Sequence, residues 1–475
     1  MTLRLHDTAT RSVREFVPRE PGKVSMYLCG LTVQSEPHIG HLRSGVSYDV
    51  LRRWFERNDY QVRFIRNITD IDDKVLQKSL EQGRAFWSIA YANEVILDAA
   101  YRSLNVLPPT YAPRATGHIT EMHGLIAQLI DNGHAYAAED GSGDVYFDVK
   151  SYADYGALSG QRVDEMTSAA DSSDRAKRDP RDFALWKGYK PDEPVEAQWP
   201  SPWGAGRPGW HIECSAMCLR YLGPEFDIHG GGLDLTFPHH ENEIAQSRSA
   251  GLPFARFWVH NGLLNLGEAK MGKSTGNVLD LDYVTALGVR MVDLRHYFVS
   301  VHYRSRIDYS DEALRESATA YRRIEGFVQR AVESVGAIPA GDLPAGFVEA
   351  LDDDLNTSGA FAVVHETVHA GNTALAAGDD AGVRAALGSV RAMLDVLGLD
   401  PLDPAWSVAS TGGTPGEELR EIIDSLVALA LDQRAQARSR KDWTAADAVR
   451  DQLNSAGVNV EDTPHGPRWT IGTRD

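Results

Sequence analysis

Two histidines lie three residues apart in the segment Pro-His-Ile-Gly-His at residues 37–41, just after an apolar run that ends at Leu28. The segment falls where a strand is expected to give way to a helix, and a helix N-terminus offers free N–H groups to a phosphate. His38 and His41 can both donate hydrogen bonds to a polyphosphate, and Gly40 lets an adenine ring approach the backbone. The pattern predicts a nucleotide-phosphate site. A capped helix with two solvated histidines is the alternative for this pair alone.

Two lysines, Lys270 and Lys273, lie three residues apart in Lys-Met-Gly-Lys-Ser. On a glycine-containing turn they would form a mobile positive clamp for the charge that develops on a leaving pyrophosphate. Residues 267–274 also satisfy the P-loop pattern G-x-x-x-x-G-K-[ST], which would indicate a nucleotide hydrolase or motor. A P-loop runs straight into a helix, whereas Gly276 and Asn277 break this segment at once, so its context argues against that alternative.

A third group combines two thiols with a histidine and a carboxylate. His239 and Glu243 are four residues apart, on one face of a helix expected to start after Pro238, so their side chains can converge. Together with Cys29 and Cys214 they make a zinc-type donor set, softer than calcium or magnesium prefers. The long gaps would make this a tertiary site. The alternative is two buried thiols beside a solvated helix face.

Neighbouring residues offer two variations on this set. His240 and Cys218 lie next to or near the expected ligands and could substitute for them. His240 and Glu241 also begin the metalloprotease pattern His-Glu-x-x-His, but Ile244 stands where the second histidine is needed, so that interpretation fails.

The elements that must position these groups alternate between strand and helix up to about residue 308. Such alternation predicts an α/β fold with a doubly wound parallel sheet. We expect helices at about 38–55, 73–80 and 89–104. Short alternating strands and a polar stretch indicate an insertion at about 110–205 within this domain, which covers residues 1–308.

From residue 309 the sequence is helical almost throughout. Amphipathic spacing over 312–335, 347–377 and 381–397 predicts a helical-bundle domain at 309–400. Residues 401–416, rich in proline and glycine, are expected to be a linker. A small α+β module at 417–475 follows, with helices at about 417–438 and 444–455 and a short strand pair.

Composition limits the class of protein. The chain has 475 residues, 43% of them hydrophobic, and a net charge of −19, which excludes a basic coat that holds nucleic acid by bulk charge. Three cysteines are too few for a disulfide framework, so a reducing compartment is expected. No apolar run approaches the roughly 20 residues of a membrane span. We therefore expect a cytoplasmic protein with no membrane or DNA partner.

Six motifs in order along the chain resemble those of the cysteinyl-tRNA synthetases, a family of class I aminoacyl-tRNA synthetases. They are Cys-Gly-x-Thr-Val from Cys29, Pro-His-Ile-Gly-His from Pro37, Asn-Ile-Thr-Asp from Asn67, Gly-Trp-His-Ile-Glu-Cys from Gly209, Asp-Ile-His-Gly-Gly-Gly from Asp227 with Phe-Pro-His-His-Glu-Asn-Glu from Phe237, and Lys-Met-Gly-Lys-Ser from Lys270. The likeness covers nearly the whole chain. It departs from the family at Gly272, which replaces a serine, and at Leu31, Gln34 and Ser35.

The resemblance implies a class I Rossmann-type catalytic domain that makes cysteinyl-adenylate from L-cysteine and ATP, with magnesium accompanying the ATP, and passes the cysteinyl group to cysteine tRNA. It assigns one zinc ion to Cys29, Cys214, His239 and Glu243; zinc prefers thiolate and would separate cysteine from serine without editing. The resemblance also assigns residues to the two substrates. Gly30, Thr32, Thr69, Trp210 and His229 match the cysteine pocket, and His38, Gly40, His41, Gly230, Gly231, Gly232, Asp234, Lys270 and Lys273 match the ATP site, with His38, His41, Lys270 and Lys273 catalytic.

The same resemblance implies that the bundle contacts the tRNA stem and that the terminal module reads the anticodon. Arg434, Arg438, Arg440 and Lys441 form a basic run in that module, which would contact tRNA unless it is an ordinary solvated helix end. A related cysteine ligase of mycothiol synthesis resembles the same catalytic core but lacks the terminal module. The presence of that module here argues against this alternative. A non-catalytic paralogue is disfavoured by the intact histidines and lysines. We expect a monomer.

Overall fold

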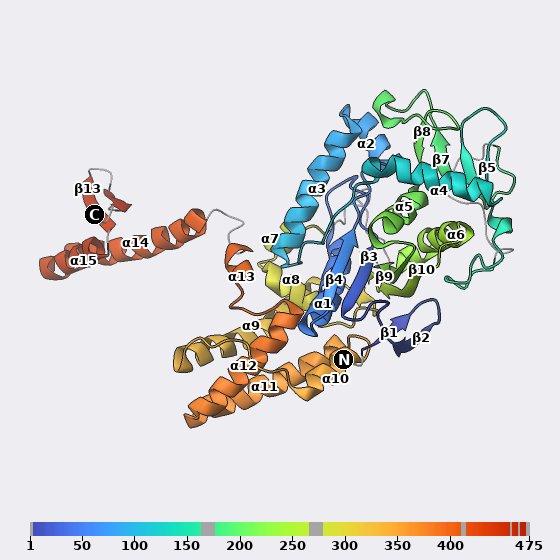
Figure 1. Cartoon of the computed structure of the whole chain (residues 1–475). Coiled ribbons are helices and arrows are strands. Elements are labelled where there is room, and N and C mark those ends of the chain that lie inside the picture. Colours follow the sequence, from blue (N-terminus) through green and yellow to red (C-terminus); the bar gives the residue numbers. More distant parts are fainter. Residues whose placement is uncertain are drawn as a thin grey trace. The chain divides into compact units, whose positions relative to one another are not determined.

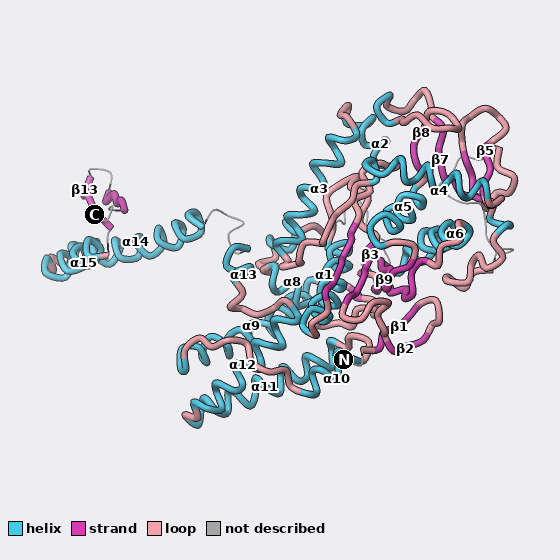
Figure 2. The backbone as a smooth tube through the Cα atoms, in the orientation of Figure 1, coloured by secondary structure: helices cyan, strands magenta, loops and turns pink. Residues whose placement is uncertain are grey.

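The computed structural model describes residues 3–162, 176–265, 279–409, 415–456, 458–463 and 466–471. The chain divides into two compact units, Met1–Trp406 and Ser407–Asp475. Figures 1 and 2 show the order of helices and strands along the chain, and each unit is described here by itself.

A four-stranded parallel sheet forms the centre of the larger unit, with the strand order β10-β9-β3-β4. Its strands are β3 (Lys23–Leu28), β4 (Gln61–Arg66), β9 (Glu225–Gly232) and β10 (Phe254–Asn261). From β3 the chain crosses to β4 on one side, and from β9 it crosses to β10 on the other. The order of strands therefore reverses between β3 and β9, and in open α/β sheets ligands bind at the carboxyl ends of the strands at such a point.

Helix α1 (Ile39–Arg57) follows β3 and forms for a simple reason of spacing. Leu42, Val46, Val50 and Trp54 recur every four residues, and all four are buried. This apolar stripe packs against the rest of the larger unit. The packing holds the N-terminus of the helix near the end of β3. Prediction of a helix at 38–55 is confirmed.

This part of the larger unit contains further helices. They are α2 (Asp73–Gln82), α3 (Phe86–Ser103), α5 (Trp210–Leu222), α6 (Glu241–Ser249), α7 (Leu281–Ala286) and α8 (Met291–Val299). Two small strand pairs lie outside the sheet: β1 (Arg4–Asp7) with β2 (Ser12–Glu15), and β11 (Leu264–Asn265) with β12 (Ile307–Asp308).

A second, antiparallel sheet lies between β4 and β9 in the chain, with the order β5-β6-β7-β8. Its strands are β5 (Ala135–Ala137), β6 (Val145–Phe147), β7 (Phe183–Gly188) and β8 (Gly206–Pro208), preceded by α4 (Ile119–Asp131). This sheet is inserted into the Rossmann-type domain, as the sequence led us to expect.

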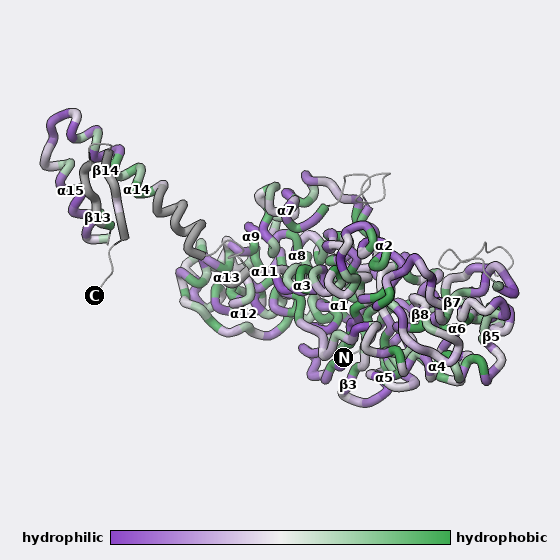
Figure 3. The backbone as a smooth tube through the Cα atoms, turned by 90° about the horizontal axis from the view of Figure 1, so that it is seen from above, coloured by the Kyte–Doolittle hydropathy of each residue, from purple (hydrophilic) through white to green (hydrophobic). Residues whose placement is uncertain are grey.

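The end of the larger unit is a helical bundle. It contains α9 (Asp311–Val335), α10 (Ala345–Asp352), α11 (Thr357–Ala377) and α12 (Asp380–Leu397), and the short α13 (Pro404–Ala409) follows at the boundary between the two units. Coloured by hydropathy, these helices alternate hydrophilic and hydrophobic stretches along the tube (Figure 3), as amphipathic helices do.

One expectation for this region is wrong. The single helix predicted over 347–377 is two helices, broken where Asp354 and Leu355 adopt positive φ angles of 57° and 51°. The carboxylate of Asp354 accepts hydrogen bonds from the N–H of His6 and the hydroxyl of Tyr303, and these tertiary bonds hold the break. The boundary between the two compact units falls within residues 401–416, the expected linker, and this stretch also contains the helix α13 (Pro404–Ala409).

The smaller unit consists of α14 (Pro415–Ser439), α15 (Trp443–Ser455) and an antiparallel hairpin of β13 (Val458–Thr463) and β14 (Gly466–Ile471). This is the α+β module that the sequence predicts. Among the described residues of both units, no helix has the length and apolar character needed to cross a membrane.

Candidate active site and metal centre

Four side chains from four segments of the chain meet at the carboxyl end of the parallel sheet. Cys29 directly follows β3, Cys214 lies in the first turns of α5, and Glu243 lies in the first turn of α6. His239 belongs to a short helical turn, Thr236–His240, that runs directly into α6; its one non-helical residue is Phe237, so the helix expected after Pro238 is formed. The four ligand atoms all lie within 4.8 Å of one another, and all four residues are buried.

Distances between these atoms test whether a tetrahedral zinc ion fits. Zn–S bonds of about 2.3 Å and Zn–N or Zn–O bonds of about 2.1 Å give tetrahedral edges of about 3.8 Å for S–S, about 3.6 Å for S–O and about 3.4 Å for N–O. The sulfurs of Cys29 and Cys214 lie 3.8 Å apart, and the Cys29 sulfur lies 3.4 Å from Oε1 of Glu243. Nε2 of His239 lies 3.1 Å from the same oxygen. The donor set therefore fits a zinc ion in spacing and in softness.

Electrostatics favour the charge states that metal ligands require at Glu243 and Cys214, but not at Cys29 or His239. Burial would lower the pKa of His239, yet the charges of Glu243 and Cys214 raise it to about 10, so a metal ion would have to displace a proton from that ring. Burial alone would raise the pKa of the Glu243 carboxyl, but His229 and His239 outweigh it and lower that pKa to about 2. Burial likewise opposes ionisation of Cys214, yet the hydrogen bond with Cys29 and the charge of His239 lower its pKa to about 6. Burial raises the pKa of Cys29 well above its usual value, so a metal ion would be needed to ionise both thiols together.

Two histidines that sequence reasoning did not name, His211 and His260, contact His239 and His240. Nδ1 of His211 lies 2.9 Å from Nδ1 of His239. His240 and His260 are joined by a ring hydrogen bond of 2.7 Å. The only hint in the sequence was that His211 follows Trp210 inside a recognised motif.

His229, which the sequence assigned to the cysteine pocket, has a different place. It is fully buried and lies 2.9 Å from the second oxygen of Glu243, so it orients that carboxylate. His229 also belongs to a second group with metal-binding spacing, Cys29, His229, His240 and Glu243, which shares two residues with the first. The expectation that His240 could substitute as a ligand therefore has a geometric basis.

Other residues of the expected cysteine pocket gather beside the metal ligands. The centroid of a Trp210 ring lies 4.3 Å from that of His239, with the two ring planes tilted by 32°. Thr32 and Thr69 form an isolated bridge between the loops that follow β3 and β4. Gly30 lies so close to the backbone that a Cβ there would be 1.7 Å from the carbonyl oxygen of Asn67. The N–H of Gly30 also donates to the Asn67 side chain at 2.8 Å.

His38 and His41 stack on each other at the N-terminus of α1, with ring centroids 3.4 Å apart. Nδ1 of His38 accepts from the N–H of His41, and Nδ1 of His41 accepts from the N–H of His38, both at 3.3 Å. Burial lowers the pKa of His38 to about 4 and that of His41 to about 3. Both rings are therefore neutral near pH 7, and because Nδ1 is an acceptor, each carries its proton on Nε2. Gly40, half-buried, completes this turn.

The three glycines at the end of β9 are explained in part by packing. A Cβ on Gly230 would meet the Tyr48 ring at 2.2 Å, and one on Gly231 would meet His240 at 2.8 Å. The hydroxyl of Tyr48 also accepts from the N–H of Gly231 at 2.8 Å. The third, Gly232, ends the strand. Asp234, two residues beyond, is exposed.

The predicted lysine clamp, Lys270 and Lys273, lies outside the described residues, which stop at Asn265 and resume at Leu279. Leu279, the first described residue after that gap, bonds to the turn that contains His38 and His41: the N–H of Ile39 donates to the carbonyl of Leu279 at 2.9 Å. The chain that leads away from the segment is therefore held beside His38 and His41.

Arg43, one turn into α1, binds the chain just before the undescribed residues 266–278. Its guanidinium is fully buried and donates to the carbonyls of Gly262 and Leu263 at 2.8 and 2.9 Å. It also bonds carbonyls within residues 302–305. Sequence reasoning missed this residue, because nothing in its spacing indicates a partner more than 200 residues away.

In the smaller unit, the four residues of the predicted basic run differ in exposure. Arg438, Arg440 and Lys441 are exposed, whereas Arg434 is buried. A buried guanidinium is not presented to a partner, so the expectation that all four residues share one basic surface is wrong.

Family models match three successive parts of the chain. Residues 15–319 match the class I (C) tRNA synthetase catalytic domain, residues 346–401 match the DALR domain, and residues 426–469 match the cysteinyl-tRNA ligase anticodon-binding domain. Solved structures share the fold at low sequence identity. A methionyl-tRNA synthetase of Mycobacterium tuberculosis is 17% identical, with a TM-score of 0.59 over 83% of this chain and 95% of that one. A leucyl-tRNA synthetase of Agrobacterium radiobacter is 11% identical, with a TM-score of 0.58 over 84% of this chain and 86% of that one.

Fold and catalytic domain together define a class I aminoacyl-tRNA synthetase. Among curated relatives, the cysteine–tRNA ligase of Nocardioides sp. is 58% identical over 99% of this chain and 100% of its own length, and that of Streptomyces avermitilis is 55% identical over the full length of both. The chain belongs to the cysteine–tRNA ligase family. It is therefore a ligase, and the P-loop and amino-sugar alternatives raised by the sequence are set aside.

Proposed function

We propose that this chain activates L-cysteine with ATP and transfers it to cysteine tRNA, and that Cys29, Cys214, His239 and Glu243 hold one zinc ion that recognises the substrate. The observation that carries the proposal is the agreement between the spacing of these four side chains and the edges of a zinc tetrahedron. When bound, zinc supplies a Lewis acid that prefers thiolate sulfur to hydroxyl oxygen, and so distinguishes cysteine from serine.

The chain's own residues would shape the amino-acid pocket. Trp210, half-buried against His239, offers an aromatic wall beside the metal ligands. Gly30 allows the loop after β3 to lie on Asn67, which leaves the floor of the pocket free of a side chain. His229 holds the carboxylate of Glu243 in position as a ligand.

For ATP, the neutral histidine pair would donate from Nε2 to the polyphosphate, which carries magnesium. His38 and His41 add no net charge near pH 7, so their part is to orient the phosphates for in-line attack by the cysteine carboxylate. Lys270 and Lys273 would supply the positive charge that stabilises the leaving pyrophosphate. Gly40 and Gly230–Gly232 with Asp234 would border the adenosine.

The remaining parts are assigned to tRNA. We propose that residues 1–308 form the catalytic domain, 309–400 the stem-contacting bundle and 417–475 the anticodon module, with Arg438, Arg440 and Lys441 as tRNA contacts. The reduced, metal-binding thiols favour the cytoplasm. We propose that the chain acts there as a monomer.

The test is cysteine-dependent exchange of labelled pyrophosphate into ATP, with serine as the control amino acid, followed by charging of cysteine tRNA. We expect exchange with cysteine alone, and charging by the same preparation. Exchange without charging, when another cysteine–tRNA ligase charges the same tRNA, would contradict the proposed acceptor. Absence of exchange with zinc-loaded protein would contradict the whole proposal.

A further inference from the structure

Asn67 lies where the loops that follow the two strands β3 and β4 meet. It directly follows β4, and because Leu28 of β3 pairs with Arg66 of β4, Cys29 and Asn67 leave the sheet side by side. The side chain of Asn67 is fully buried. Sequence reasoning named the motif that begins at this residue but gave the residue no role. Its amide nevertheless bonds to both loops of the candidate cysteine pocket.

Both ends of the Asn67 amide are used, and one bond fixes the direction of the other. The N–H of Gly30 donates to Oδ1 of Asn67 at 2.8 Å. A backbone N–H can only donate, so this bond determines which end of the amide carries the oxygen. Nδ2 therefore faces Oγ1 of Thr69, 3.2 Å away, and donates to it. The oxygen of Thr69 is thereby held as a hydrogen-bond acceptor.

This arrangement leaves the hydroxyl of Thr69 with an unused proton. Its oxygen accepts from Asn67, and none of the residues that the structure describes accepts its O–H. Thr69 is 1% exposed, so little water reaches this donor. A buried donor without a partner is costly, and a role at a functional site is one reason for a protein to keep it.

Backbone hydrogen bonds hold Thr69 in place. Its N–H donates to the carbonyl of Leu31 at 3.2 Å, and its carbonyl accepts from the N–H of Val33 at 3.1 Å. These bonds extend the pairing of β3 with β4 into the two loops beyond the sheet. Because the backbone of Thr69 is fixed on both sides, the direction of its hydroxyl proton is set chiefly by the side chain of Asn67.

We propose that Asn67 is a positioning residue for the substrate cysteine: it keeps the Thr69 oxygen as an acceptor, so that the Thr69 hydroxyl donates its proton to the bound amino acid. This inference rests on the proposed function, because it requires Thr69 to line the cysteine pocket. Cysteine offers two anionic acceptors, its carboxylate and its zinc-bound thiolate. A hydrogen bond to a charged acceptor is stronger than one between neutral groups, so its loss should weaken binding measurably.

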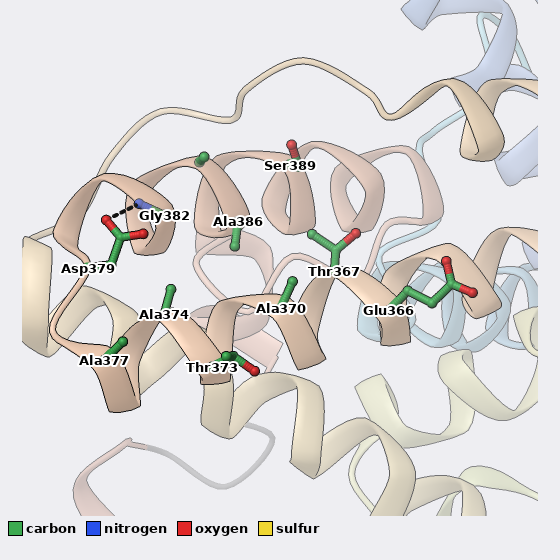
Figure 4. A pocket seen from close by; sticks show the side chains of 11 residues that line it. Glu366, Thr367, Ala370, Thr373, Ala374, Ala377, Asp379, Gly382, Ala386 and Ser389 are labelled. Atoms are coloured by element: carbon green, nitrogen blue, oxygen red, sulfur yellow. Dashed lines mark hydrogen bonds between the residues drawn. The ribbon is translucent and has the colours of Figure 1, made fainter.

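A groove in the helical bundle provides a contrast. It lies between α11 and α12, has a volume of about 670 Å³, and is lined largely by small side chains together with two carboxylates, Glu366 and Asp379 (Figure 4). Asp379 accepts from the N–H of Gly382 at the start of α12, so it is used within the fold. None of the polar side chains that line this groove is buried. The buried, unused donor of Thr69 has no counterpart there.

Asn67→Asp tests the direction of the bond with little change of shape. The aspartate still accepts from the N–H of Gly30, but its second oxygen accepts instead of donating, so the Thr69 hydroxyl turns to it and away from the substrate. Cysteine binding to the zinc-loaded, full-length protein is measured by isothermal titration calorimetry without ATP. We expect N67D to weaken binding by about 10- to 100-fold. Asn132→Asp, the same substitution at an exposed position after α4, should bind cysteine like the parent.

Substitutions at Thr69 separate the hydroxyl from the added charge. T69V removes the donor and should weaken binding about as much as N67D does, whereas T69S keeps the hydroxyl and should restore most of the affinity. In the T69V background, N67D should have little further effect, because the hydroxyl on which it acts is gone. If the aspartate prevents folding, N67A removes the same donor without adding charge and is judged by the same criterion.

An equal loss of affinity from the Asn67 substitution with and without the Thr69 hydroxyl would overturn the inference, as would parental affinity in N67D. Neither residue is a proposed metal ligand, so the variants should keep the zinc content of the parent. In pyrophosphate exchange we expect the KM for cysteine to rise while the KM for ATP stays near the parental value. A parent that neither binds cysteine nor catalyses exchange would contradict the proposed function, whereas an active parent with unaltered variants contradicts only this inference.

Discussion

The guanidinium of Arg295 donates to the carboxylate of Asp49, and both side chains are almost fully buried. This pair joins α8 to α1, the helix that carries the histidine turn. The other N–H groups of Arg295 donate to the carbonyls of Leu104 and Leu397, at the ends of α3 and α12. One side chain thus fastens the catalytic domain to the helical bundle.

Replacing Arg295 with methionine should lower the free energy of unfolding of the larger unit by about 3–5 kcal/mol, because a buried charge and several carbonyls lose their partner. Urea unfolding followed by circular dichroism measures the change. The control is Arg384→Met on the exposed face of α12, which should alter stability by less than about 0.5 kcal/mol. Equal effects of the two substitutions would contradict a specific role for the pair.

Cys214→Ser should abolish stoichiometric zinc binding, since it replaces a soft thiolate ligand with a hydroxyl. Metal analysis of purified protein should find about one zinc per chain in the parent and far less in the variant. Cys218→Ala is the matched control, because Cys218 is also buried in α5 but lies outside both groups with metal-binding spacing. Comparable zinc loss in the control would count against the proposed ligand set.

Gly30→Ala should damage the cysteine pocket, because the new Cβ would clash with the Asn67 carbonyl and force the loop after β3 to move. In pyrophosphate exchange we expect the KM for cysteine to rise more than the KM for ATP. Gly124→Ala is the control, because Gly124 lies within α4 with open space around it. This substitution should raise the free energy of unfolding by about 0.5–1 kcal/mol instead of damaging the pocket. An unchanged KM for cysteine would show that Gly30 does not shape the pocket.

His296 should make stability depend on pH. Burial in α8 lowers its pKa from 6.5 to about 4, and its ring bonds the Ser317 hydroxyl at 2.7 Å. The unfolded chain therefore takes up a proton near pH 6.5 that the folded chain takes up only near pH 4. Stability contributed by the neutral ring is complete above pH 6.5 and is lost as pH falls toward 4, by roughly 3 kcal/mol.

Urea unfolding between pH 4 and pH 7.5 tests this prediction. His296→Gln should show a smaller loss of stability than the parent over that interval. His369→Gln, the same substitution at an exposed position of α11, should follow the parent curve. If the two variants show the same pH dependence, the buried ring is not the group that titrates.

Much of the fold could be predicted because local patterns determine it. The apolar stripe of α9 predicts a helix at 312–335, and the structure has Asp311–Val335. The break between α10 and α11 could not be predicted, since it is held by a bond from His6 to Asp354, 348 residues away in the chain.

In the candidate site, too, local sequence patterns predicted some features, while others depend on contacts between distant residues. The residue types of the metal centre could be read from the sequence, but spacing alone could not join Cys29 to Cys214; only the resemblance did so. The supporting roles of His211 and Arg43 depend on tertiary hydrogen bonds and left no periodic signal. The roles assigned to Lys270 and Lys273 stay predictions.

The reversal of strand order between β3 and β9 has a consequence for biosynthesis. Glu243 emerges from the ribosome 214 residues after Cys29. At a translation rate of about 5–20 residues per second, roughly 10–40 s separate the synthesis of Cys29 from that of Glu243. During this interval the edge of β3 that later pairs with β9 has no partner strand. The inserted sheet is translated within that interval. The candidate metal site can therefore form only late in synthesis, after β9 has been made and has paired with β3.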